Sequence, residues 1–196
     1  MPTGNQRLPW ITISVCLAAW LVWMLPTALQ SIFIYDRSAI IQGQAWRLWT
    51  GHLVHFTPSH LGWNLTAFVL AASWCERANF PHARWFVLLA PPSVSLVLLA
   101  FDSRLQLYGG LSGLITSVVA FCCVSEWRFS GPTRRRFWLL VLTLLVLKIL
   151  GEYYSGMSAF VRLEGTDIQV APISHLSGLC IGIIFAILPV THERKS

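Results

Sequence analysis

Residues 109–127 read GGLSGLITSVVAFCCVSEW, an apolar run that starts with two glycines and has a serine, Ser112, close behind them. About 20 apolar residues are needed to cross the roughly 30 Å hydrocarbon core of a bilayer, and this run approaches that length. Glycines at the start of such a helix let other backbones approach closely and leave amides near the serine. A helix-packing glycine cluster with an N-capping serine explains the segment about as well as a catalytic serine does.

Five further apolar runs lie on either side of this one, and each is near the length of a membrane span. The sequence therefore predicts an all-α membrane protein, a single domain over residues 1–196 built as a bundle of six transmembrane helices. The predicted spans cover residues 10–35, 60–75, 83–101, 110–127, 137–154 and 171–190. Pro91 and Pro92, in the middle of the third span, are expected to kink that helix or break it locally.

Composition supports the bilayer as the solvent of this chain. Of its 196 residues, 55% are hydrophobic and 11% are charged, whereas a soluble domain is about one quarter charged. The net charge of +6 does not indicate nucleic-acid binding, because the basic residues lie in short loops between apolar runs. The lipid bilayer is the expected environment, and no nucleic-acid partner is predicted.

The distribution of Lys and Arg predicts the orientation. With the N-terminus inside, nine of the fourteen basic residues fall in inner segments and four in outer segments, while Lys148 lies within a span. This excess predicts that both termini are cytoplasmic. Several tryptophans lie at the predicted inner helix ends, as an interfacial belt requires. The long outer connection, residues 36–59, mixes aromatic with basic residues and is expected to lie in the membrane interface.

Two polar residues, Ser112 and His175, are placed at the same depth near the outer surface by this topology. Polar groups inside spans are costly, and each is a functional candidate. A histidine beside a serine can accept its proton and make it a nucleophile. Small residues spaced four apart in both spans are expected to bring the two helices together. These residues are Gly113 and Ser117 in one span and Gly178 and Gly182 in the other.

His60 and Asn64, at the outer start of the second span, are one helical turn apart and share a face. Both side chains can donate hydrogen bonds, as groups that stabilise an oxyanion must. A capping pair that holds down the preceding loop is the structural alternative. Since no Asp or Glu lies beside His175 in the sequence, the pattern predicts a Ser112–His175 dyad rather than a triad.

These motifs resemble those of one known family, the rhomboid intramembrane serine proteases. Residues 110–113 are similar to their Gly-x-Ser-x nucleophile motif, residues 174–182 to their final catalytic helix, and His60-x-x-x-Asn64 to their oxyanion pair. The resemblance implies a catalytic Ser112 and His175, with Gly110 and Leu111 joining His60 and Asn64 in oxyanion and substrate binding. It implies no cofactor and no metal.

The segment WRLWTGHLVH, residues 46–55, and the bare six-span core resemble the rhombosortase branch of bacterial rhomboids. This branch is associated with removing C-terminal Gly-Gly-containing sorting tails from exported proteins. The resemblance implies transmembrane substrates with such tails, and a bacterial cytoplasmic membrane with the active site facing the periplasm. Thr116 stands where many rhomboids place a tyrosine that stacks on the histidine, so Tyr153 or Tyr154 is a candidate for orienting His175.

Other residues have alternative interpretations. Lys148 and Glu152 are expected to form an i, i+4 ion pair within the fifth span, although Glu152 is also a candidate for receiving substrate or the leaving amine. His52, His55 and His60 have a spacing that suggests zinc, but the sequence offers no suitable fourth ligand nearby. The five cysteines are interpreted as inert buried thiols. They are Cys16, Cys75, Cys122, Cys123 and Cys180.

The sequence thus favours an intramembrane serine endopeptidase. Two rival functions remain open: a catalytically silent rhomboid-like protein that binds transmembrane clients, and a small transporter in which Ser112, His175 and Glu152 line a polar path. No inverted repeat, which would favour a transporter, is evident in the sequence. Stoichiometric labelling by a serine-directed inhibitor distinguishes the enzyme from both.

Overall fold

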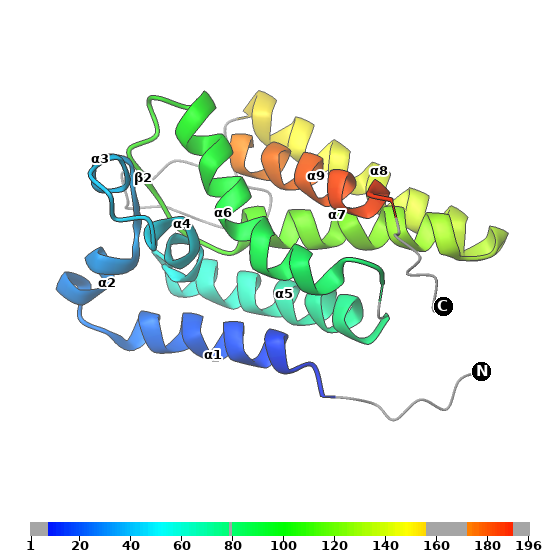
Figure 1. Ribbon diagram of the computed structural model, residues 1–196, viewed down its shortest axis with the longest axis horizontal. Coiled ribbons are helices and arrows are strands. Elements are labelled where there is room, and N and C mark those ends of the chain that lie inside the picture. The colour runs from blue at the N-terminus through cyan, green and yellow to red at the C-terminus, as the bar shows by residue number, and fades with distance from the viewer. Residues whose placement is uncertain (1–7, 79, 156–171, 190–196) are drawn as a thin grey trace, which may run out of the picture.

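A computed structural model describes residues 8–78, 80–155 and 172–189 of the chain. Its six long helices form a bundle (Figure 1). In chain order they are α1 (Trp10–Met24), α5 (Pro58–Ala78), α6 (Ala83–Phe101), α7 (Ser112–Phe129), α8 (Pro132–Ser155) and α9 (Pro172–Ile187).

Helix α7 occupies the centre of the bundle. It contacts α5 on one side and α8 and α9 on the other, and α6 also packs against it (Figure 1). Most of its residues are buried, whereas α1 and α8 lie at the edges with large apolar side chains exposed. A helix that is surrounded on several sides is the natural place for groups that must be kept from lipid.

Helices α7 and α9 are packed backbone to backbone through glycines. A Cβ atom at Gly178 would overlap the carbonyl oxygen of Gly113, and one at Gly182 would overlap the carbonyl oxygen of Ser117. Only glycine allows so close an approach. The prediction that small residues bring these two helices together is confirmed.

The first predicted span is wrong in its extent. Helix α1 ends at Met24, because Leu25 adopts an extended conformation (φ −71°, ψ 151°) before Pro26, and a residue that precedes proline is disfavoured in the helical region. A separate short helix, α2 (Thr27–Phe33), follows. The 10–35 segment is therefore a helix, a break and a second helical piece.

The connection between α2 and α5 is folded into short elements. These are strand β1 (Tyr35–Asp36), helices α3 (Arg37–Ile41) and α4 (Arg47–Thr50), and the 3-10 turn η1 (Gly51–Leu53). β1 pairs antiparallel with β2 (Leu107–Tyr108), with Tyr35 opposite Tyr108. This two-stranded ribbon ties the connection to the segment that leads into α7.

Pro91 and Pro92 do not break α6, which continues from Ala83 to Phe101. A proline at position 92 leaves the carbonyl of Leu88 without its usual amide donor. The indole Nε1–H of Trp49 donates to that carbonyl at 3.2 Å. The ring Nε2 of His52 lies 2.9 Å from the carbonyl oxygen of Pro91. Trp49 thus compensates α6 for the amide that Pro92 lacks, and His52 makes a second contact between the connection and α6.

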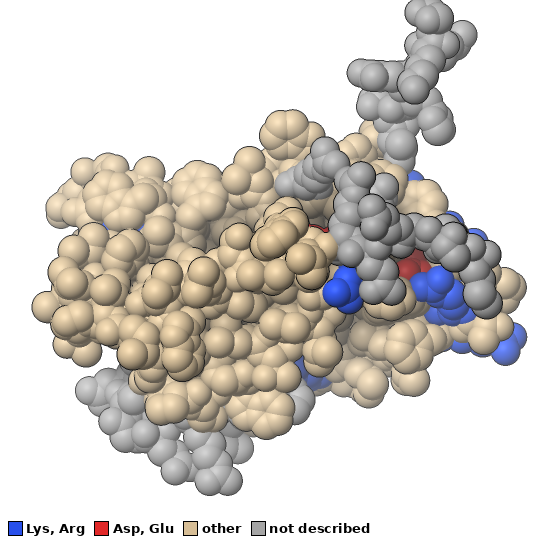
Figure 2. Space-filling model, turned by 90° about the horizontal axis from the view of Figure 1, so that it is seen from below, with Lys and Arg blue, Asp and Glu red and all other residues tan. Residues whose placement is uncertain are grey.

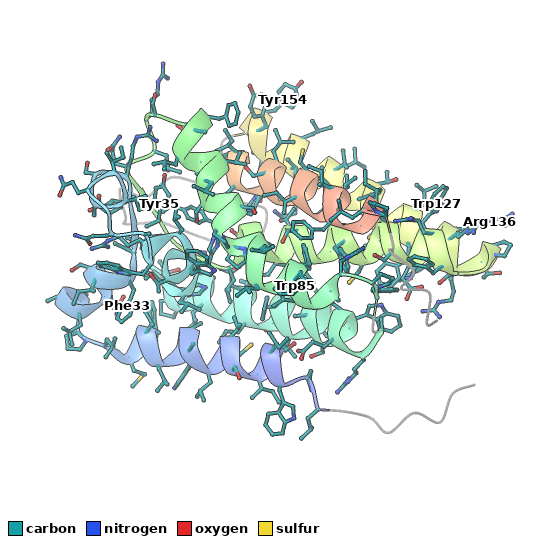
Figure 3. The ribbon with its side chains drawn as sticks, in the orientation of Figure 1. Phe33, Tyr35, Trp85, Trp127, Arg136 and Tyr154 are labelled. Carbon is teal, nitrogen blue, oxygen red and sulfur yellow. The ribbon has the colours of Figure 1, made fainter. Side chains whose placement is uncertain are left out.

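The surface fits a bilayer environment, because α1 and α8 expose large apolar side chains. In the described part of the chain, α8 alone is both long and apolar enough to cross a membrane by those criteria, and shorter apolar helices occur at residues 10–24, 85–101 and 172–187. Figure 2 shows basic side chains gathered at one end of the face in view. Trp127 and Arg136 lie at one end of the bundle, opposite Phe33 and Tyr35 (Figure 3).

Candidate active site

Ser112 is the first residue of α7, directly after a tight backbone turn at Gly110. The φ angle of Gly110 is +112°, a conformation that residues with a Cβ atom rarely adopt. The Tyr108 hydroxyl donates to the Gly110 carbonyl at 3.2 Å and holds the turn. The first amides of a helix have no intrahelical acceptor, so Ser112 lies where backbone N–H groups are available.

Helix α5 places His60 and Asn64 against this turn. A Cβ atom at Gly110 would lie 2.5 Å from Nε2 of His60 and 3.4 Å from Nδ2 of Asn64. Both side chains are buried. The residue before the Leu111–Ser112 step must therefore be glycine for two reasons, its positive φ and the ring that lies against it. The structure thus places the predicted His60–Asn64 pair against Gly110, two residues before Ser112 in the chain.

Helix α9 places His175 on the other side of the same turn. A Cβ atom at Gly113 would lie 3.1 Å from the carbonyl oxygen of Ser174, so the residues that follow Ser112 and precede His175 are in contact. His175 is also an electrostatic neighbour of His60. Ser112, His175, His60 and Asn64, which are separated by more than one hundred residues in sequence, therefore meet at one place.

Three polar atoms in this cluster are buried and, among the described residues, have no hydrogen-bond partner. They are Nδ1 of His60, Nδ2 of Asn64 and Nε2 of His175. Buried polar groups are normally hydrogen-bonded, and exceptions occur at functional sites. The missing partner of His175 Nε2 also means that its bond to Ser112 is not made in this structure. Catalytic hydrogen bonds are often long before substrate binds.

A carboxylate that the sequence pattern did not predict lies at the other nitrogen of the histidine ring. Oε2 of Glu152, on α8, is 2.7 Å from Nδ1 of His175. The same oxygen accepts from Nζ of Lys148 at 2.9 Å, which confirms the predicted ion pair. The expectation that His175 has no acidic partner is wrong, because Glu152 is 23 residues away in sequence but adjacent in the fold.

A comparison with protein families matches the Rhomboid domain over residues 42–191, which is most of the chain. The chain belongs to the rhomboid family. Rhomboid proteins are membrane proteins and are generally serine proteases that act on transmembrane substrates within the bilayer. A separate comparison with curated proteins found no match.

In this rhomboid chain, neither of the two tyrosines proposed to orient His175 does so. Tyr153 and Tyr154 are 72% and 83% exposed, and Figure 3 shows Tyr154 at the edge of the bundle. Thr116 does not replace the family tyrosine either, because its hydroxyl donates to the carbonyl of Ser112 at 2.9 Å, one turn back along its own helix. Among the described residues, Glu152 makes the side-chain contact with the His175 ring nitrogen.

Tyr108 is a site residue that sequence reasoning missed. Its hydroxyl lies within hydrogen-bonding reach of the side chains of Ser112 and Ser174, and burial raises its pKa, so it remains a hydroxyl donor. The position of an aromatic residue directly before Gly109-Gly110 was the only sequence signal. Leu111, also predicted to take part in binding, is fully buried in the apolar core, and its carbonyl accepts the amide of Ile115 at 2.7 Å.

The loop histidines have structural partners. Burial lowers the pKa of His52 to about 4 and that of His55 to about 3, so both are neutral at pH 7. His52 contacts the carbonyl of Pro91, and Nδ1 of His55 lies 3.0 Å from the carbonyl of Leu53. Over the described ranges of the chain, no group of three His, Cys, Asp or Glu side chains is arranged to hold a metal ion.

Proposed function

We propose that this rhomboid protein is an intramembrane serine endopeptidase in which Ser112 is the nucleophile and His175 the general base. One observation supports this most directly. Helix α5 places Nε2 of His60 and Nδ2 of Asn64 against the turn before Ser112, and Nδ2 of Asn64 and Nε2 of His175 are buried with no hydrogen-bond partner among the described residues. A helix-packing role for the glycines alone does not account for these atoms.

The first half of the reaction transfers the substrate acyl group to the enzyme. Oγ of Ser112 forms a bond to the carbonyl carbon of the scissile peptide while its proton moves to Nε2 of His175. The C–N bond then breaks, and the proton passes from Nε2 to the leaving nitrogen. In the second half, a water molecule gives a proton to Nε2 of His175 and attacks the ester carbon. The ester C–O bond then breaks, Nε2 returns the proton to Oγ of Ser112, and the new carboxyl end is released.

The negative oxygen of the tetrahedral intermediate needs donors that are already in place. His60, Asn64 and the Ser112 amide at the start of α7 are the proposed donors, with Gly110 allowing the close approach of the first two. The positive end of the helix dipole points to the same place. Loss of one such donor lowers the rate by about 10²–10³-fold in other serine proteases.

The proposed substrates are exported proteins with C-terminal Gly-Gly-type sorting tails, cleaved near the outer face of the bacterial cytoplasmic membrane. The rhombosortase-like segment at residues 46–55 supports the substrate class. The excess of basic residues in the predicted inner segments supports cytoplasmic termini and a periplasmic active site. Basic side chains at the inner end of the bundle, such as Arg134, which pairs with Glu126, fit this orientation.

The test is cleavage of a reporter that carries a Gly-Gly-type C-terminal tail, in cells that express wild type, Ser112→Ala or His175→Ala at equal, membrane-inserted levels. Each variant is expected to lose roughly 10⁴-fold or more of the activity, because the nucleophile and its base act as a unit. Ser14→Ala on α1, an exposed position outside the site, is the control and is expected to retain cleavage.

Labelling with a fluorophosphonate reports on Ser112 without any assumption about the substrate. Wild type is expected to be labelled stoichiometrically, and Ser112→Ala is expected not to be labelled. Absence of labelling in wild type would favour a silent client-binding protein or a transporter. Labelling without cleavage of the tail reporter would retain the protease and reject the sorting-tail substrate.

A further inference from the structure

Glu152 is buried in a helix that otherwise faces outward. In α8, all of whose residues the structure describes, only Ile149 and Glu152 are buried, and Glu152 is 2% exposed. A carboxylate inside a membrane helix is costly unless it is paired. The position of Glu152 on the face that meets α9 therefore indicates a role that involves α9.

Two contacts of Glu152 meet at one carboxylate oxygen. Oε2 lies 2.7 Å from Nδ1 of His175 and 2.9 Å from Nζ of Lys148. Because a carboxylate accepts hydrogen bonds, the short contact to His175 requires the ring proton to be on Nδ1. Nε2 then carries the lone pair and is the nitrogen able to accept a proton from Ser112.

We propose that Glu152 is the positioning residue of the active site, so that the catalytic unit is Ser112–His175–Glu152 with Lys148 behind it. The inference rests on the proposed protease function and deepens it. Glu152 holds the imidazole in one tautomer and orientation, and it supplies the negative charge that stabilises the imidazolium formed when His175 takes the proton of Ser112.

Lys148 makes this arrangement possible inside a membrane. Its positive charge balances that of Glu152 in the resting enzyme, through the 2.9 Å contact between Nζ and Oε2. The ion pair keeps Glu152 ionised. A neutral glutamic acid could donate its own proton to Nδ1 and would then favour the wrong tautomer of His175.

A purely structural role for Glu152, as a link between α8 and α9, makes different predictions from a positioning role. The variant Glu152→Gln keeps the size of the side chain but loses the charge, and its amide N–H₂ can donate to Nδ1 and favour the wrong tautomer. The matched control is Glu126→Gln on α7. Glu126 is also a buried glutamate in an ion pair, with Arg134 at 2.8 Å, but it lies at the other end of the helix from Ser112.

The experiment measures fluorophosphonate labelling of Ser112, and kcat and KM for a cleaved reporter, in purified full-length protein of equal folded fraction. We expect Glu152→Gln to lower both the labelling rate and kcat by about 10²–10⁴-fold with little change in KM, by analogy with loss of the orienting carboxylate in other serine proteases. Glu152→Asp is expected to recover part of the loss, and Glu126→Gln to label at the wild-type rate.

The outcomes distinguish the two proposals. Wild type that is not labelled, or labelling that survives Ser112→Ala, would reject the protease function itself. Normal labelling of wild type together with wild-type labelling of Glu152→Gln would reject only the positioning role. Equal losses in Glu152→Gln and Glu126→Gln would assign Glu152 to structure alone.

A second measurement does not depend on whether Glu152→Gln folds. Nitrogen-15 NMR of histidine-labelled wild type, with the His175 signals assigned by difference from His175→Asn, reports which ring nitrogen carries the proton. A proton on Nδ1 and an unprotonated Nε2 support the inference. A proton on Nε2 in the neutral ring would overturn it.

Discussion

The two helices that hold the catalytic candidates are joined to α9 in opposite ways. Helix α7 meets α9 through glycines, with Gly178 and Gly182 against the backbone of α7. Helix α8 meets α9 through a polar link, the Glu152–His175 contact, and leaves most of its surface exposed. We call the packing of Gly178 and Gly182 against α7 the glycine joint, and the Glu152–His175 contact the polar joint. The glycine joint sets how close Ser112 and His175 can be, whereas the polar joint sets how the His175 ring is turned.

This difference explains why the two joints use different chemistry. In a bilayer, lipid tails are as apolar as the helices, so close packing and hydrogen bonds, rather than the hydrophobic effect, hold helices together. Close backbone packing gives a fixed distance but cannot orient a side chain. A hydrogen-bonded carboxylate can orient a ring, and its cost inside the membrane is offset by Lys148.

The largest expected effect comes from breaking the glycine joint. Gly178→Ala places a Cβ atom onto the carbonyl of Gly113 and 3.2 Å from the amide of Ser117, so one helix must move. Overpacking of this kind typically costs about 1–3 kcal/mol, and we expect labelling of Ser112 to fall with it. Thermal unfolding in detergent and the labelling rate are the measurements.

Gly151→Ala on α8 is the matched control for the glycine joint. Beyond its own helix backbone, no atom of the described residues lies within 4 Å of a Cβ at that position, and replacing an exposed helical glycine by alanine stabilises by up to about 1 kcal/mol. If both substitutions lowered the melting temperature equally, α7 and α9 would not be packed as described.

An intermediate effect is expected from weakening the polar joint without removing its carboxylate. Lys148→Met removes the charge on Nζ but keeps the apolar stem, so the Glu152–His175 contact survives. The variant removes one hydrogen bond to a charged group and leaves the helix packing intact, so it should destabilise less than Gly178→Ala does, and the labelling rate should fall less than it does in Glu152→Gln. Labelling slower than that of Glu152→Gln would make Lys148, rather than Glu152, the group on which His175 depends.

The control for Lys148→Met is Arg134→Met. Arg134 pairs with Glu126 at the opposite end of the bundle, and its side chain is 56% exposed. Arg134→Met leaves the buried Glu126 without this partner and is expected to lower stability, but the pair lies at the other end of α7 from Ser112, so the variant should label at the wild-type rate.

The smallest effect, absent at neutral pH, concerns another polar joint, between His52 and α6. The folded-state pKa of His52 is about 4, below its ordinary value of 6.5. Above pH 6.5 the ring is neutral in both states. Below it the unfolded chain binds a proton that the folded protein does not, so stability falls as the pH drops from 6.5 toward 4.

Melting temperatures between pH 7.5 and pH 4 test this expectation. His52→Gln, which keeps a donor for the Pro91 carbonyl and does not titrate, should give a flatter profile than wild type. The glycine joint between α7 and α9 contains no titrating group, so Gly178→Ala should shift the whole profile without changing its slope. Identical slopes for wild type and His52→Gln would contradict the buried, neutral state of this histidine.

Local sequence patterns predicted several of the helices well, α6 with its two prolines included. The apolar run at residues 83–101 corresponds to α6 over the same residues, and the small residues spaced four apart correctly identified the contact between α7 and α9. The first span was predicted too long because its apolar character continues past Leu25, while the backbone conformation required before Pro26 ends the helix at Met24. Hydrophobicity alone does not record that steric limit.

The sequence by itself determined the family, the membrane setting and the group of Ser112, His175, His60 and Asn64 as site candidates, because motif order and helical periodicity are properties of the chain. Only the tertiary structure decided which acidic side chain contacts His175. Whether Glu152 faces α9 or lipid depends on the rotation of α8 about its own axis, and the apolar run that precedes Lys148 in α8 has no polar face that would reveal this rotation. The same holds for Tyr108, whose hydroxyl reaches Ser112 and Ser174 only because the β1–β2 ribbon and the Gly110 turn bring it there.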